Sequence, residues 1–103
     1  MSTEETKKLI VNVKDLNFRS EQLVLDLIRY LTEQLPQLQI TRNGNEMEIA
    51  TPNQLSNRAI KLRIKKFLYK KNLTSDYRPI SIIDPLKEGY FIKEKKALEL
   101  SYY

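Results

Sequence analysis

Residues 56–71 of the chain read SNRAIKLRIKKFLYKK, and this stretch decides the fold. Ser56 is of a residue type that commonly caps the first turn of a helix. Four apolar residues then recur at the three- and four-residue spacing of one helix face: Ile60, Ile64, Phe67 and Leu68. The pattern predicts a helix over residues 56–71 whose apolar side packs on a sheet.

The same stretch carries the net positive charge of the protein. No acidic residue stands between Glu48 and Asp76, and seven basic residues lie on the predicted helix: Arg58, Lys61, Arg63, Lys65, Lys66, Lys70 and Lys71. Without these seven, the 18 basic residues of the chain fall to 11, against 13 acidic ones. Ordinary exposed helices mix both signs, because opposite charges three or four residues apart attract. A helix with seven like charges therefore predicts contact with a polyanion, most often the phosphate backbone of a nucleic acid.

At about 100° per residue, six of these cations sort into two stripes on the outer side of the helix. One stripe consists of Arg58, Lys61 and Lys65, and the other of Arg63, Lys66 and Lys70. Lys71 turns toward the core side. Leu62 and Tyr69 lie between the stripes, where they are either ordinary exposed residues or contacts to RNA. For Tyr69 and Tyr77 both base stacking and half-buried packing with a wet hydroxyl stay open.

Local signals predict the remaining elements. Ser20 and Pro36 bound a second amphipathic helix, and Asn43-Gly44-Asn45 favours a tight hairpin turn. Strands are predicted at residues 9–13, 38–42, 46–51, 80–83 and 90–93, with Pro79 tolerable only near the start of its strand. The order β-α-β-β-α-β-β predicts an α+β fold, in which a small, mostly antiparallel sheet of about five strands packs against two helices. Residues 1–103 are expected to form a single domain.

Composition argues against several classes of function. The chain has no cysteine and no histidine, which removes disulfides, thiolate metal sites, and the commonest general base and metal ligand. With two glycines, no glycine-rich phosphate loop can be drawn. We therefore expect a protein that is not an enzyme and needs no metal or cofactor, although Asp76, Tyr77 and Lys87 could be nominated as a polar cluster. The polar amino terminus and the lack of a long apolar run favour a cytosolic or nuclear location and no membrane partner.

The basic helix and the segment after it resemble a known family. The matching residues are Ser56-Asn57-Arg58, Lys61, Lys65-Lys66-Phe67-Leu68, Lys70, Asn72-Leu73, Asp76-Tyr77 and Lys87-Glu88-Gly89-Tyr90. Between residues 52 and 90 this arrangement is similar to the eukaryotic type of large-subunit ribosomal protein L twenty-two. Before residue 52 the likeness consists of element order, the hairpin, and Glu21-Gln22 in the first helix.

The resemblance implies a structural constituent of the cytosolic large ribosomal subunit that binds ribosomal RNA through the basic helix. Its partners would be large-subunit ribosomal RNA and neighbouring ribosomal proteins, with no small-molecule substrate, and its location the cytosolic ribosome, with a nucleolar stage during assembly. A paralogue that binds structured RNA away from the ribosome fits the same residues. A basic-helix module for a membrane or a protein partner is a weaker alternative, because the apolar stripe is expected to be covered by the sheet. DNA ranks below RNA, because no short helix is expected directly before the basic one.

Overall fold

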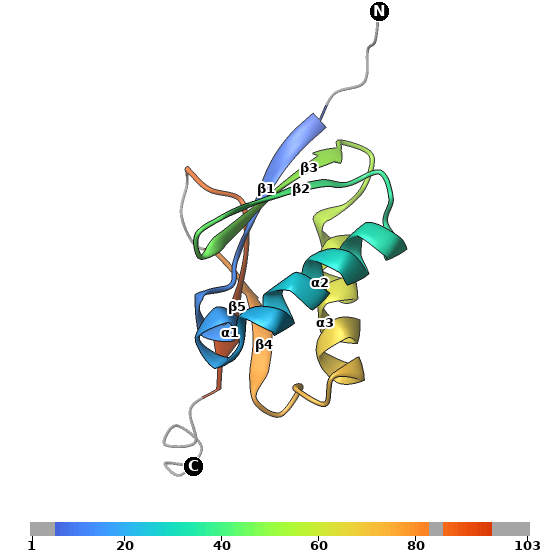
Figure 1. The fold of residues 1–103 in the computed structure, drawn as a ribbon. Helices are drawn as coiled ribbons and strands as arrows, with labels where there is room; N and C mark the ends of the chain where they lie inside the picture. Colours follow the sequence, from blue (N-terminus) through green and yellow to red (C-terminus); the bar gives the residue numbers. More distant parts are fainter. Residues whose placement is uncertain (1–5, 83–85, 96–103) are drawn as a thin grey trace, which may run out of the picture.

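Five strands and three helices make up the part of the chain that the computed structural model describes, residues 6–82 and 86–95. In chain order these are β1 (Thr6–Asn12), α1 (Lys14–Arg19), α2 (Glu21–Gln34), β2 (Gln39–Asn43), β3 (Glu46–Pro52), α3 (Asn57–Lys70), β4 (Tyr77–Ser81) and β5 (Gly89–Glu94). Figure 1 shows them as one sheet with α2 and α3 on the same side. The expected α+β class is confirmed.

The sheet has the strand order β2-β3-β1-β5-β4, and its neighbours are antiparallel except for the parallel pair β1 and β5. That parallel pair depends on a glycine. A Cβ atom at Gly89 would lie 1.7 Å from the backbone oxygen of Ile10, so no other residue type allows β5 to approach β1 this closely. At the β2–β3 turn, Gly44 has a φ of +66°, as the Asn-Gly signal predicts.

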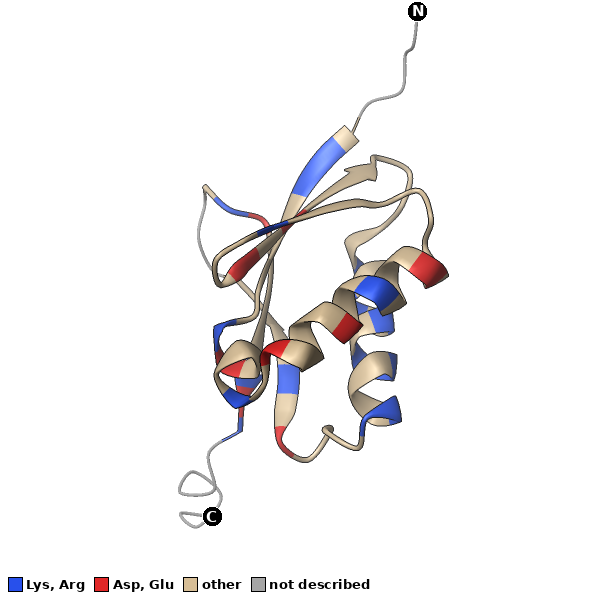
Figure 2. Cartoon of the chain, viewed as in Figure 1, with Lys and Arg blue, Asp and Glu red and all other residues tan. Residues whose placement is uncertain are grey.

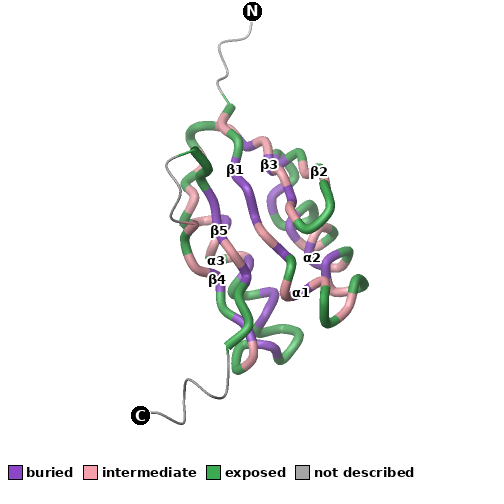
Figure 3. The backbone as a smooth tube through the Cα atoms, turned by 90° about the vertical axis from the view of Figure 1, so that its left-hand side faces the viewer, coloured by how far each residue is buried: buried purple, intermediate pink, exposed green. Residues whose placement is uncertain are grey.

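The core lies between the sheet and the two long helices. Its buried side chains come from alternate strand positions, such as Leu9 and Val11 of β1, and from the apolar faces of α2 and α3. No helix covers the opposite face of the sheet among the described residues, as the side view in Figure 3 makes visible. None of the helices in the described ranges has the length and apolar character needed to cross a bilayer.

Three parts of the sequence-based prediction differ from the structure. The strand predicted at residues 9–13 begins earlier, at Thr6, and ends at Asn12. Helix α1 was not predicted, because its six residues are too few to display a helical period. It buries Leu16 and contacts α2 and β5. The strand predicted at residues 80–83 begins earlier, at Tyr77, so Pro79 lies at its centre; residue 83 is outside the described ranges. Proline is tolerated there because β4 is an edge strand.

The ends of the basic helix follow its capping residues. The Ser56 side chain accepts a hydrogen bond from the backbone N–H of Ala59, at 3.2 Å. At the other end Asn72 has a φ of 60°, a left-handed conformation that asparagine tolerates and that turns the chain out of the helix. Ser20 also occupies a cap position, before α2, but its side chain makes no cap hydrogen bond.

Candidate nucleic-acid interface

The predicted orientation of α3 is confirmed. All four residues of its apolar stripe are buried: Ile60, Ile64, Phe67 and Leu68. Leu62 and Tyr69, which were predicted to face outward, are 50% and 76% exposed. Because the stripe is held by the core, the polar side of the helix is fixed in its direction toward solvent. Figure 2 shows Lys and Arg positions along α3 and no acidic position on it.

Six of the seven predicted site residues have no carboxylate oxygen within 4.0 Å among the described residues. These six are Arg58, Lys61, Arg63, Lys65, Lys66 and Lys70. Lys71 differs, since its Nζ lies 3.5 Å from Oδ2 of Asp26 on α2 and 5.9 Å from the centre of the Phe67 ring. Its position on the core side was predicted, but its carboxylate partner was not. The Asp26 pair leaves Lys71 with less free charge to offer an anion.

The first stripe lines two hollows that meet at one residue. The first, of about 330 Å³, is lined by Arg58, Ala59, Lys61, Leu62 and Lys65. The second, of about 220 Å³, is lined by Lys65, Leu68, Thr74, Tyr77, Arg78, Pro79 and Lys95. Lys65 lines both hollows. The second hollow lies between α3 and β4, and we call it the α3–β4 groove. None of its lining residues is acidic.

Sequence reasoning missed two cations of this groove. Arg78 lies on β4, and Lys95 directly follows β5, where its Nζ donates to the backbone oxygen of Thr74 at 2.8 Å. Neither residue belongs to a local sequence pattern that predicts a binding site. They are identified as groove residues only by the pairing of β4 with β5 and the packing of β4 beside α3.

The second stripe lies against α2. Arg63 Nη1 donates to Oε1 of Gln34 at 3.2 Å, whereas each stripe has one lysine Nζ that lies 5.7 Å from the centre of a tyrosine ring, Lys70 from Tyr30 and Lys61 from Tyr90. A hollow of about 160 Å³ beside Lys70 and Lys71 also contains charges of both signs, from Asp26, Arg29 and Glu33. The α3–β4 groove is therefore the more purely cationic side of the helix.

The two tyrosines proposed for stacking have different surroundings. Tyr69 is exposed on the outer side of α3, where it can contact a sugar or a base. Tyr77 is 2% exposed, and burial raises the pKa of its hydroxyl. The Arg19 guanidinium lies 5.9 Å from the centre of its ring. A base cannot stack on Tyr77 in this structure. The residue packs in the core, more deeply than the half-buried position with a wet hydroxyl that was predicted.

The polar cluster nominated for catalysis is not assembled. Asp76 accepts from Arg19 at the start of β4, whereas Lys87 pairs with Glu46 near the start of β5. Because β4 and β5 are antiparallel, these two positions lie at opposite ends of the hairpin. Within the described residues, no group of three or more acidic, histidine or cysteine side chains could hold a metal ion.

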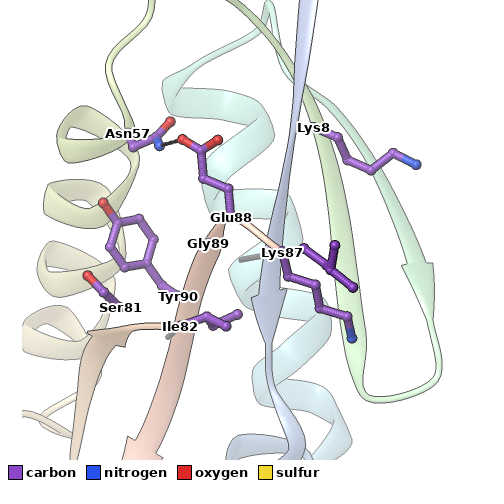
Figure 4. A pocket seen from close by; sticks show the side chains of 9 residues that line it. Lys8, Asn57, Ser81, Ile82, Lys87, Glu88, Gly89 and Tyr90 are labelled. Atoms are coloured by element: carbon purple, nitrogen blue, oxygen red, sulfur yellow. Dashed lines mark hydrogen bonds between the residues drawn. The ribbon is translucent and has the colours of Figure 1, made fainter. Parts of the chain in front are cut away.

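Lys87 lines a different and larger hollow, of about 540 Å³, beside the first turn of α3 (Figure 4). Asn57 donates to the Glu88 carboxylate there, while the buried Oδ1 of Asn57 has no hydrogen-bond partner in the described structure. The remaining lining residues include no second carboxylate: they are Lys8, Ser81, Ile82, Leu86, Gly89 and Tyr90.

In comparisons with known proteins, no family model and no curated protein matches the chain. The function must therefore be inferred from α3 and its surroundings.

Proposed function

We propose that this protein is a structural constituent of the cytosolic large ribosomal subunit and binds ribosomal RNA through α3. The observation that carries the proposal is the fixed, unneutralised cationic side of that helix. The buried stripe prevents α3 from rotating, and six cations project from it without a carboxylate partner in the described part of the chain. Like charges held this closely repel, and a bound polyanion removes that repulsion.

This surface suits RNA better than DNA that is recognised through its base sequence. An A-form duplex is recognised largely through phosphates and 2′-hydroxyls, which lysine and arginine side chains contact without reading bases. The α3–β4 groove adds Arg78 and Lys95 to the first stripe, so the cationic strip is wider than one helix face. The element directly before α3 is the β2–β3 hairpin and not a short helix, which disfavours a helix-turn-helix site on DNA.

The ribosomal part of the proposal comes from the resemblance to the L twenty-two family. Several residues that carry the likeness have defined roles in this fold: Ser56 caps α3, Phe67 and Leu68 fill the core, and Gly89 allows β5 to meet β1. Large-subunit ribosomal RNA and neighbouring ribosomal proteins are the proposed partners, and the cytosolic ribosome, with a nucleolar stage during assembly, is the proposed location.

An RNA-binding paralogue away from the ribosome is the second candidate, because the same helix can grip any structured RNA. A membrane or a helix-binding protein is disfavoured, since either would need the apolar stripe of α3 that the core already covers.

Sedimentation of cell extract through a sucrose gradient tests the ribosomal proposal. We expect the native protein to migrate with large subunits and the Lys65→Ala/Lys66→Ala variant to shift toward the top of the gradient. Lys14→Ala, which removes an exposed lysine from α1, serves as the control and should stay with the subunits. A native protein found only at the top would contradict the ribosomal assignment. If that protein still binds an RNA hairpin in vitro, the paralogue interpretation is favoured.

A further inference from the structure

The sheet face opposite α2 and α3, which no helix of the described residues covers, has an uneven charge distribution. On the β1–β3 side, Lys8 pairs with Glu48 at 3.5 Å, and nearby Lys87 pairs with Glu46 at 3.0 Å. On the β4–β5 side, Arg78 and Lys93 lie directly opposite each other on neighbouring strands, and both are exposed. Neither has a carboxylate within 4.0 Å among the described residues. Like charges at directly opposite positions destabilise a sheet, so this pair favours an anionic partner.

Two apolar side chains accompany these cations. Ile80 and Phe91 are directly opposite each other, two positions along the strands from Arg78 and Lys93 and therefore on the same face. Strand alternation directs them away from the core, which contains their neighbours Tyr77, Tyr90 and Ile92. Phe91 and Ile80 are each half-buried, and Lys93 Nζ lies 5.9 Å from the centre of the Phe91 ring. Figure 3 shows this part of the sheet without a covering helix.

We propose that this β4–β5 face binds an unpaired segment of RNA, with a base against Phe91 and Ile80 and its phosphates on Arg78 and Lys93. Aromatic rings on sheets stack bases without strong sequence preference, while nearby cations hold the backbone. Charge complementarity and the partly exposed ring together favour a single-stranded nucleic acid over an acidic peptide, which would use the cations but not the ring.

The position of Arg78 connects this face to the groove described above. Arg78 lies on the edge strand β4 and also lines the α3–β4 groove. A strand that leaves an RNA duplex held by α3 can therefore continue around β4 onto the sheet. The choice of RNA as the ligand rests on the proposed function, whereas the placement of an unpaired segment on β4–β5 rests on the residues of this face.

The test measures binding of two probes, a blunt RNA hairpin and the same hairpin with a short single-stranded uridine tail. For the native protein we expect tighter binding to the tailed probe. Phe91→Leu keeps an apolar side chain but removes the stacking ring, and it should weaken binding to the tailed hairpin about 5-fold or more. Binding to the blunt hairpin should be unchanged.

Lys93→Gln tests the same face with an exposed residue that no core packing requires, so the proposal remains testable if Phe91→Leu fails to fold. It should reduce tailed-probe binding selectively, whereas Lys65→Ala/Lys66→Ala should weaken both probes. Equal affinity of the native protein for the two probes, or no selective loss in either face variant, would overturn the inference. So would displacement of the tail by a poly-glutamate peptide as effectively as by free oligouridine. If the native protein binds the free tail but not the blunt hairpin, the duplex contact of α3 fails while the β4–β5 inference stands.

Discussion

Removal of Lys65 and Lys66 gives a quantitative test of α3 as the RNA contact surface. A protein that neutralises phosphates releases counterions when it binds. The logarithm of its binding constant therefore falls linearly with the logarithm of the salt concentration, with a slope of about 0.9 for each phosphate contact on a duplex. If all six unpaired cations of α3 contact phosphates, affinity should fall about 1,000-fold between about 50 and 200 mM salt. Lys65→Ala/Lys66→Ala leaves four of these contacts, so the same change in salt should cost only about 100-fold, and the slope should be shallower by about two units.

The structure provides a matched control on the same helix. Lys71 is already paired with Asp26, so Lys71→Ala should leave the slope nearly unchanged, although it also removes a lysine. Fluorescence anisotropy with a labelled RNA hairpin, titrated at several salt concentrations, measures all three slopes. Equal slopes for the native protein and Lys65→Ala/Lys66→Ala would refute α3 as the phosphate contact. A loss for Lys71→Ala as large as that for the double variant would show that net charge, and not the geometry of the helix, governs binding.

Four further substitutions, one of them a control, test the electrostatics and the fold. Asp26→Asn should free Lys71 and steepen the salt slope by up to about 0.9 unit. Gln22 on the preceding turn of α2 donates a hydrogen bond to the Asp26 carboxylate. This bond and the Lys71 ammonium lower the pKa of Asp26 below its ordinary 3.8. The stability from this carboxylate is therefore present above that pH and is lost as the pH falls through the lowered pKa, so Asp26→Asn should flatten the acid limb of a thermal-stability profile. Ser56→Ala should cost about 1 kcal/mol in urea unfolding, whereas Ser20→Ala should be nearly neutral because its side chain makes no cap hydrogen bond; equal costs would contradict the capping role. Gly89→Ala should prevent native folding as judged by circular dichroism, because its Cβ would lie 1.7 Å from a backbone oxygen of β1, and a well-folded variant would contradict that packing.

The local parts of the fold could be predicted from the sequence. The period of Ile60, Ile64 and Phe67 gave the core side of α3 correctly, since helical geometry alone determines which residues share a face. The Asn-Gly turn and Pro36 likewise placed the β2–β3 hairpin and the end of α2 to within a few residues. The start of β4 was wrong because an edge strand accepts Pro79 at its centre, and edge position is a property of the assembled sheet.

The sequence by itself determined that one helix would carry localised positive charge and which of its sides would be buried, because both follow from spacing along a single element. Only the tertiary structure decided how that charge is used. It brought Asp26 of α2 to Lys71, added Arg78 and Lys95 to the groove beside Lys65, and buried Tyr77. These contacts join residues that are distant in the chain, and their distances depend on strand order and helix packing, which no local period encodes.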